Sequence, residues 1–497
     1  MGSKMTNAEG SRWSARDELG FPDVVGAFIE GKWHAEATAE QLLVLDPGTA
    51  MPLIALATSD GHIVDVAVKA ADAAFRTSWW RRDPLGRSRV LSALSTALLS
   101  ERDRLARAES VDTGKPLSQA YSDVDTAARY FEFYGGVADK IGGETIPSTA
   151  GSLVYTLREP YGVVAHITPW NSPLAQMCRG LAPSLAAGNA VVVKPSEITP
   201  ISTLYAAQLF VRAGLPQGLC NVVVGHGPQT GGSLVRHPLV RHVTFTGSVA
   251  TGKAVMAMAA DRIVGCSLEL GGKSPTIVLP DADLEAAASA GAAAVVRNAG
   301  QSCFATTRLL VHRSCYYDLA DRIERKMGAL CVGHGLDDPD LGPLASADQL
   351  KRVRSYLSIA KTEGAEIHRA AGSVPDGAGY FERPVLLTGV SNTMTVAREE
   401  IFGPVQSMIP FDSEEEAVVL ANDSDYGLAA GVFTRSLKAA HWIAAELDAG
   451  QVQINRYPSG GVETPFGGYK SSGIGREKGL EALRSYTQLK TVILDLG

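Results

Sequence analysis

Apolar residues recur along the chain at two spacings, and the spacing changes near Tyr161. Before that point, the stretches 63–79 and 85–108 carry Ala, Leu and Val at helical intervals, and Pro84 stands where the first turn of a helix accepts proline. We therefore expect two helices to precede any sheet core.

Residues 142–147 and 153–157 alternate between apolar and polar like the strands of a hairpin, and residues 486–495 alternate in the same way. An isolated hairpin of this size is at best marginally stable in water. These segments predict a small β element that does not stand alone.

From Tyr161 onward, short apolar runs alternate with helical stretches. Such alternation is typical of a parallel sheet with helices on both faces, in which ligands collect at the carboxyl ends of the strands. This part of the chain predicts a Rossmann-like, doubly wound α/β domain that binds a dinucleotide. The expected strands are 162–168, 190–193, 219–224, 242–246 and 263–268.

A second α/β unit is expected beyond Lys273. Between its first two strands lies 284–296, which is almost entirely Ala, Val and Gly, so a helix there would present small faces that pack closely on all sides. The strands of this unit are expected at 276–279, at 308–312, before Phe411 and at 452–455.

The composition agrees with a large globular protein. At 497 residues, 45% of them hydrophobic, the chain is long enough for about three domains. The net charge of -7 is spread without a basic run, which argues against a nucleic acid or an anionic membrane as a partner.

Six cysteines lie far apart, with no Cys-x-x-Cys and no His pair at ligand spacing, so neither a disulfide framework nor a metal site is expected. The longest apolar run, 286–296, is too short to span a bilayer, and the first thirty residues lack a signal-peptide core. Met1 to Lys4 precede a second methionine and are typical of an expression tag. We expect a cytoplasmic protein.

The strongest chemical signal is the stretch from Glu269 to Cys303, which has a carboxylate at one end and a thiol at the other. A thiolate is a strong nucleophile, and a carboxyl group buried among apolar neighbours has a pKa raised toward the range useful to a general base. The pair suits covalent catalysis followed by hydrolysis. Taken alone, a Glu and a Cys are more often a surface charge and a small buried hydrophobe.

The dinucleotide fingerprint Gly-x-Gly-x-x-Gly is missing, because Thr230 takes the third glycine's place after Gly225-His226-Gly227. A better candidate is Gly247-Ser248, between a strand and the helix expected over 249–260, where free backbone N–H groups and the helix dipole can hold a pyrophosphate. An ordinary strand-to-helix turn is the alternative.

Seven blocks, in order, resemble the signature blocks of the NAD(P)-dependent aldehyde dehydrogenase superfamily over residues 21 to 495. Together they are specific, although each alone would be weak. They are Pro169-Trp170-Asn171, Lys194-Pro195-Ser196-Glu197, Phe245-Thr246-Gly247-Ser248, Glu269-Leu270-Gly271-Gly272-Lys273, Gly300-Gln301-Ser302-Cys303, Glu400-Ile401-Phe402-Gly403-Pro404 and Pro465-Phe466-Gly467-Gly468.

The resemblance implies a division of the chain into three parts and a homodimer or homotetramer. The small β element would serve oligomerisation, with the tail completing a partner subunit's sheet. The implied parts are an NAD-binding domain (21–138 and 159–271), a catalytic domain (272–466) and an oligomerisation element (139–158 and 486–497).

The resemblance also implies the reaction. Cys303 would attack an aldehyde, Asn171 and the Cys303 backbone N–H would bind the resulting oxyanion, and Glu269 would activate the water that hydrolyses the thioester. Family members that transfer the acyl group to coenzyme A generally lack this glutamate, so hydrolysis is expected. The alternatives are that Asn171 caps the following helix and that the fold serves binding or structure without catalysis.

Further residues are implied to bind the cofactor. Lys194 and Glu197 would clamp the adenosine ribose, and the Glu197 carboxylate would repel a 2'-phosphate, so NAD is expected in preference to NADP. A solvated ion pair and, at Glu399-Glu400, a surface acidic pair are the alternatives. The other implied cofactor residues are Thr168, Trp170, Ser196, Gly247, Ser248, Leu270, Glu400 and Phe402.

The substrate tunnel is the least constrained part. Arg179 and Arg297 resemble the pair with which succinic semialdehyde dehydrogenases hold a distal carboxylate. Small residues at Ser172 and Gly460, next to Gly461, instead favour a wider tunnel for an aromatic or medium-chain aldehyde. Structural salt bridges are the further alternative for both arginines.

One departure from the family concerns Gly180, where many members carry a lysine that supports the general base; Arg179 is the nearest cation in this chain. His166 is also unusual in its strand, and a hydrogen-bonded core histidine is the expected reading.

Overall fold

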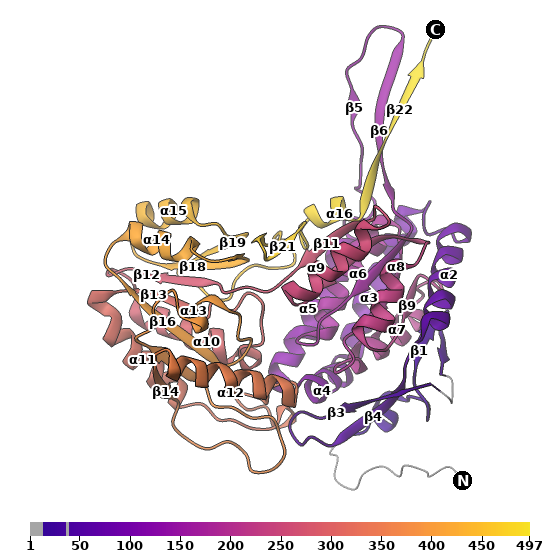
Figure 1. Cartoon of the computed structure of the whole chain (residues 1–497). Coiled ribbons are helices and arrows are strands. Elements are labelled where there is room, and N and C mark those ends of the chain that lie inside the picture. Colours follow the sequence, from indigo (N-terminus) through magenta and orange to yellow (C-terminus); the bar gives the residue numbers. More distant parts are fainter. Residues whose placement is uncertain (1–12, 36–38) are drawn as a thin grey trace, which may run out of the picture.

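The computed structural model describes residues 13–35 and 39–497, which form two lobes with a thin arm projecting from one of them (Figure 1). The expression tag expected at Met1 to Lys4 lies outside the described residues. Each lobe is built around one large sheet, and the arm is a separate small sheet.

The first lobe holds an eight-stranded sheet whose inner strands are parallel. In spatial order its strands are β2 (Lys32–His34), β1 (Ala27–Ile29), β9 (Cys220–Val222), β8 (Ala190–Lys194), β7 (Val163–Ile167), β10 (Val240–Thr246), β11 (Gly265–Glu269) and β21 (Gly473–Ile474). All five strands expected from Tyr161 onward are therefore present.

Two groups of helices cover this sheet, and contacts run within each group. One group is α2 (Gly61–Thr77), α8 (Gly232–Arg236) and α9 (Val249–Ala260). The other is α3 (Pro84–Ser100), α4 (Arg102–Thr113), α5 (Leu117–Gly135), α6 (Pro173–Ala187) and α7 (Ile201–Arg212). The expected doubly wound arrangement is confirmed.

Two expectations for the first part of the chain are wrong. Strands β1 and β2 precede α2 and join the large sheet. The helix α1 (Ala15–Leu19) and the separate two-stranded sheet of β3 (Gln41–Leu45) and β4 (Pro52–Ala57) also precede α2. Strands of three residues are too short to show an alternating pattern. The stretch 85–108 is broken at Glu101, whose backbone (φ -106°, ψ 20°) leaves the helical region while its carboxylate accepts a hydrogen bond from the Tyr205 hydroxyl at 2.9 Å.

The second lobe holds a seven-stranded, mostly parallel sheet. Its strands in order are β14 (Glu366–Arg369), β15 (Val385–Thr388), β16 (Val405–Phe411), β13 (Arg308–His312), β12 (Pro275–Val278), β18 (Ala429–Phe433) and β19 (Gln451–Ile454). Its helices are α10 (Leu284–Val296), α11 (Tyr316–Gly328), α12 (Ala347–Thr362), α13 (Thr395–Arg398), α14 (Glu414–Asn422) and α15 (Leu437–Glu446).

Helix α10 has the small faces that its composition predicts. It packs on α11 so closely that a Cβ at Gly291 would lie 3.2 Å from the Ile323 side chain. The two-residue strands β17 (Tyr426–Gly427) and β20 (Tyr469–Lys470) pair beside this lobe, and α16 (Glu481–Ser485) leads toward the arm. No helix among residues 13–35 and 39–497 is long and apolar enough to cross a membrane.

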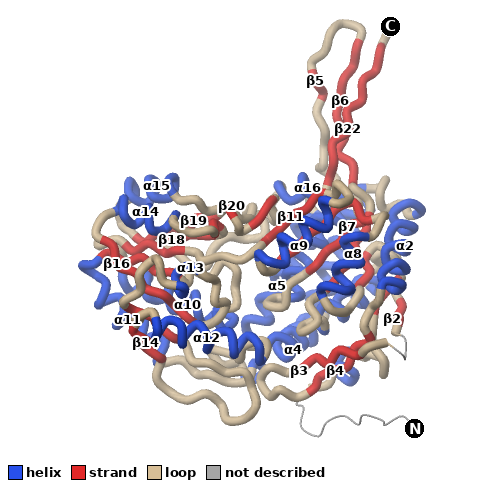
Figure 2. The backbone as a smooth tube through the Cα atoms, in the orientation of Figure 1, coloured by secondary structure: helices blue, strands red, loops and turns tan. Residues whose placement is uncertain are grey.

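The arm consists of β5 (Thr145–Ile146), β6 (Ser152–Pro160) and β22 (Thr487–Asp495), which stand clear of both lobes (Figure 2). The expected hairpin and tail strand are confirmed. The tail pairs with β6 of its own chain, antiparallel from Thr487 opposite Pro160 to Asp495 opposite Ser152. Pairing of β22 with a partner subunit's sheet stays a prediction. Exposed apolar side chains on the arm include Ile146, Leu153, Leu157, Leu489, Ile493 and Leu494.

We expect the double substitution Leu489→Asp and Ile493→Asp to lower the molar mass in solution about twofold or more, because these side chains are 60% and 73% exposed and such apolar surface marks subunit contacts. Light scattering after gel filtration measures the mass. Gln488→Asp, at the neighbouring exposed position of the same strand, is the control that adds charge alone. An unchanged mass in the double variant would exclude this strand from the subunit contact.

Candidate active site

Glu269 and Cys303 belong to loops that touch each other. Glu269 ends β11, and a Cβ at Gly272, three residues later, would lie 2.6 Å from the carbonyl oxygen of Cys303. A Cβ at Gly300 would lie 2.2 Å from the carbonyl oxygen of Gly403. Three of the sequence blocks thus meet backbone to backbone, where only glycine leaves enough room.

A strained turn presents Cys303. Asn298 (φ 49°) and Ala299 (φ 52°) both lie in the left-handed region, which costs an ordinary residue roughly 1–2 kcal/mol. The Asn298 side-chain amide donates to the carbonyl oxygens of Asn171 at 2.7 Å and of Gln301 at 3.2 Å. These bonds hold the turn and tie the loop of Cys303 to the loop of Asn171.

Asn171 points at the same loop. Its buried amide Nδ2 donates to the carbonyl oxygen of Gln301 at 2.9 Å. A side-chain amide carries two N–H groups, so the second is available to a substrate oxyanion. The helix-cap alternative does not hold, because Ser172 is the N-cap of α6 and no side-chain cap bond forms there.

Glu269 is a buried carboxyl group with an unusual environment. Its side chain is 3% exposed, and neither of its oxygens accepts a hydrogen bond from the residues that the structure describes. Burial raises its pKa well above the ordinary value, and the Arg179 guanidinium, with Nη2 3.5 Å from Glu269 Oε2, opposes that rise. Glu269 is therefore not a surface charge.

Cys303 is partly exposed at the end of the strained turn. Removal of water by the surrounding protein raises the pKa of its thiol to about 12, while the charge of Arg179 acts in the opposite direction. In this state the thiol is largely protonated at neutral pH, and a neighbouring cation or base is needed to form the thiolate.

Arg179 does not lie free in a tunnel. Its buried guanidinium forms ion pairs with Glu477 and Glu269, and it stacks on Phe466 with its carbon 4.5 Å from the ring centroid. For Arg179 the structural salt-bridge alternative therefore holds. Arg297, by contrast, is exposed and has no acidic partner within 4.0 Å among residues 13–35 and 39–497.

His166 is the core histidine that was expected. It is 3% exposed, its Nδ1 hydrogen-bonds the Thr244 hydroxyl, and its Nε2 lies 3.4 Å from the carbonyl oxygen of Gln176. Burial lowers its pKa, which keeps the ring neutral.

The implied ribose-binding residues lie at the carboxyl ends of neighbouring parallel strands. Lys194 ends β8, and its buried Nζ donates to Glu197 at 2.9 Å. Thr168 follows β7, and its hydroxyl is buried without a hydrogen-bond partner. Ser196 lies between the two ion-paired residues and is partly exposed. An unpaired buried hydroxyl beside a cation is an arrangement that a polar ligand would satisfy.

The expectation for Gly247 is wrong in one respect. Its N–H is not free, because it donates to the carbonyl oxygen of Glu269 at 3.0 Å. Ser248 is the N-cap of α9 and accepts a hydrogen bond from the Thr251 N–H at 3.2 Å. Only the first turn of α9 keeps unpaired N–H groups for an anion. Leu270 packs against Gly252 of the same helix, where a Cβ would lie 2.5 Å from it.

Glu400 and Phe402 close the far side of the Glu269 loop. Glu400 accepts a hydrogen bond from the Gly272 N–H at 3.0 Å, and burial raises its pKa to about 7, so it is not part of a surface acidic pair. Phe402 adopts φ 61° and meets Trp170 edge to face, with ring centroids 5.1 Å apart. Such strain in a bulky residue is typical of functional sites.

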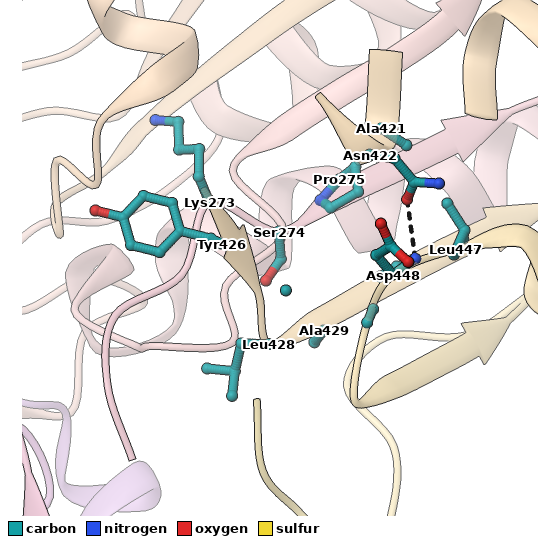
Figure 3. Close-up of a pocket in the computed structure, with 13 residues that line it drawn as sticks. Lys273, Ser274, Pro275, Ala421, Asn422, Tyr426, Leu428, Ala429, Leu447 and Asp448 are labelled. Carbon is teal, nitrogen blue, oxygen red and sulfur yellow. Dashed lines mark hydrogen bonds between the residues drawn. The ribbon is translucent and has the colours of Figure 1, made fainter. Parts of the chain in front are cut away.

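Two hollows lie near these residues. One is a pocket of about 350 Å³ between α5 and the loop containing Gly460 and Gly461, with Tyr130 and Lys478 in its wall. The other, bounded by Ser274 and Leu428, has a volume of about 10 Å³ (Figure 3). The second has room for about one water molecule. Only the first is large enough for an organic substrate.

Sequence reasoning missed Glu477 and Lys478. Both follow Gly475 and Arg476, and Glu477 is 3% exposed. An Arg-Glu-Lys run between two glycines normally marks a solvated turn, so the buried carboxylate gave no distinctive signal.

In the part of the chain that the structure describes, no cluster of three or more His, Cys, Asp or Glu side chains could hold a metal ion.

Known proteins resemble this chain over nearly its whole length. DhaS of Bacillus subtilis is 41% identical over 472 residues, 94% of this chain and 95% of its own. A betaine aldehyde dehydrogenase of Mesorhizobium japonicum is 40% identical, over 95% of this chain and 97% of its own.

Solved structures of other proteins also resemble this chain over nearly its whole length. The structure of an aldehyde dehydrogenase from Bacillus cereus in complex with NAD+ is 40% identical, with a TM-score of 0.94 over 99% of this chain and 100% of its own. The model of the aldehyde dehydrogenase family matches residues 33–492. The chain belongs to the aldehyde dehydrogenase family.

Proposed function

We propose that this protein is an NAD-dependent aldehyde dehydrogenase that oxidises an aldehyde to a carboxylic acid and releases the acid by hydrolysis. The observation that carries the proposal is the meeting of three groups: the Cys303 thiol, the Asn171 amide with one N–H to spare, and the buried Glu269 carboxyl. These are a nucleophile, an oxyanion donor and a base, which together suffice for acyl-enzyme chemistry.

The strand-end residues fit the cofactor. Lys194 and Glu197 offer a donor and an acceptor to ribose hydroxyls, the unpaired Thr168 hydroxyl lies beside them, and the first turn of α9 offers N–H groups to phosphate. NAD, when bound, supplies the acceptor for the hydride that leaves the substrate carbon.

The protein's own residues account for the other steps. The Cys303 thiolate adds to the aldehyde carbon, and Asn171 and the Cys303 N–H stabilise the oxyanion of the thiohemiacetal. After loss of hydride, a thioester to Cys303 remains. Glu269 takes a proton from water, the hydroxide adds to the thioester, and the carboxylic acid leaves as Cys303 is freed.

For the substrate we propose an aldehyde with a distal carboxylate, bound by Arg297. The support is that Arg297 has no acidic partner within 4.0 Å in the described part of the chain, whereas Arg179 is already paired with two carboxylates. Three cations, Arg179, Arg476 and Lys478, also act on Glu269 and outnumber the one other carboxylate there, that of Glu477. The cationic aldehyde that names the betaine aldehyde dehydrogenase relatives would be repelled there.

An aromatic or medium-chain aldehyde is the second candidate. It is favoured by the pocket of about 350 Å³ beside Gly460 and Gly461 and by the aromatic rings of Tyr457 and Phe466, which both contact Phe304. A protein that binds without catalysis is the remaining alternative, and the intact set of reactive groups speaks against it.

Cys303→Ala should abolish NADH formation while NAD binding persists, and Glu269→Gln should form at most one equivalent of NADH per active site. The reason is that acylation consumes the Cys303 nucleophile without hydrolysing a thioester, whereas each further turnover needs Glu269 to activate water. Rapid mixing with absorbance at 340 nm measures both. Steady turnover of Glu269→Gln near the wild-type rate would remove Glu269 from the mechanism.

The wild type should use NAD in preference to NADP, and Glu197→Gln should reduce that preference about tenfold or more, because a carboxylate and a 2'-phosphate would be like charges a few ångströms apart. The ratio of kcat/KM for the two cofactors tests this. Equal values in the wild type would mean that Glu197 does not discriminate between the cofactors.

Succinic semialdehyde should be a better substrate than an uncharged aldehyde of similar length, and Arg297→Met should raise KM for the acid alone, at a cost of roughly 2–5 kcal/mol. NADH formation at 340 nm is measured for a panel of aldehydes, and the uncharged analogue is the internal control. A wild type that prefers hexanal or benzaldehyde would contradict the carboxylate and favour the second candidate.

A further inference from the structure

The cation beside Glu269 is Arg179, which precedes the position, Gly180, where many members of the family carry a lysine. Arg179 Nη2 lies 3.5 Å from Glu269 Oε2, and this is the only polar contact of that carboxylate within the described residues. The same guanidinium is paired through Nε with Glu477 and packs on the Phe466 ring. Two carboxylates and one face of an aromatic ring therefore fix its orientation.

The neighbouring position cannot supply this cation. A Cβ at Gly180 would lie 2.0 Å from His166 Cε1 and 2.6 Å from its Nε2. The His166 ring is itself held in the core by the Thr244 hydroxyl. Because the imidazole fills the space of a side chain at position 180, any longer residue there would have to displace it. On this helix, the cation beside Glu269 is therefore supplied by position 179 and not by position 180.

We propose that Arg179 is the positioning residue of the general base: clamped by Glu477 and Phe466, its guanidinium holds Glu269 ionised and in place for hydrolysis of the acyl-enzyme. The inference rests on the proposed function and deepens it. It also assigns Arg179 to the base, and leaves the binding of the substrate to Arg297.

The charges around Glu269 give this role a direction. Without Arg179, two buried carboxylates would face each other and the proton affinity of Glu269 would rise. Without the charge of Glu477, the guanidinium would act on Glu269 alone, and the proton affinity of Glu269 would fall. The other titratable groups that act on Glu269 are Arg476 and Lys478, from the same segment as Glu477, and the thiol of Cys303 from its own loop.

The test uses Arg179→Met, Arg179→Lys and Glu477→Gln in the full-length protein. 4-Nitrophenyl acetate serves as a cofactor-free probe: the Cys303 thiolate displaces 4-nitrophenolate to give the acetyl thioester, and water then releases acetate. The rate of the slow, hydrolytic phase is measured against pH, beside kcat and KM for aldehyde oxidation.

We expect the rising limb of the hydrolytic pH profile to move up by about one pH unit or more in Arg179→Met, to move down in Glu477→Gln and to stay near the wild type in Arg179→Lys. KM for the aldehyde should stay within about twofold of the wild-type value. Arg313→Met is the matched control: Arg313 is an exposed arginine paired with Asp412 at 2.8 Å, outside the groups that act on Glu269, so its profile should not move.

Three results would overturn the proposal. A raised KM with an unmoved limb would make Arg179 a substrate-binding residue. Equal losses in Arg179→Lys and Arg179→Met without a shift would make its role structural. If Arg179→Met fails to fold, an unmoved rising limb in Glu477→Gln is enough to show that Glu477 does not act on Glu269 through Arg179.

A wild type that hydrolyses the ester but never forms NADH would instead reject the proposed function. The ester test of Arg179 would remain valid in that case.

Discussion

The arrangement of the site depends on the close approach of backbones that only glycine permits. Gly272 lies against the carbonyl of Cys303, and Gly300 lies against the carbonyl of Gly403. A methyl group at either position would force the loop of Cys303 away from the loops that carry Glu269 and Glu400. Because the Glu269 loop leaves the first lobe and Cys303 belongs to the second, the contact at Gly272 also fixes how the two lobes meet.

A second requirement is the balance of buried charge. Beneath the Asn171 loop, the buried Lys115 ammonium pairs with Glu109 at 3.3 Å and with Asp123, and donates to the Ser172 hydroxyl at 3.0 Å. Removing one member of such a cluster leaves an uncompensated charge in the interior, which costs several kcal/mol. The position of the Asn171 loop therefore relies on an ion cluster that lies outside the group of Cys303, Asn171 and Glu269.

The sequence predicts the parts of this fold that repeat a pattern over many residues. Strands such as β8 and β13 and the helix α10 match their expected bounds closely, since buried parallel strands and a small-residue helix have clear signatures. Strands β1 and β2 were not predicted, because a strand of three residues is too short to show an alternating pattern.

The site could be predicted as a set of residues but not as a set of contacts. Motif spacing brings Cys303, Asn171 and Glu269 together, yet nothing in it says that the Gly247 N–H is already bonded or that Arg179 turns toward Glu477. Both contacts depend on partners that lie far away in the sequence. The space at Gly180 is a further case, because in helix α6 it is filled by the His166 ring of strand β7.

The register of the arm has a consequence for biosynthesis. Strand β22 lies far along the sequence from its partner β6, which is synthesised long before it. Until β22 has been made, the edge of β6 that it will pair with has no strand of its own chain to accept or donate hydrogen bonds. The arm therefore cannot form as soon as β6 appears, and β6 presents an open edge to other strands throughout the synthesis of the second lobe.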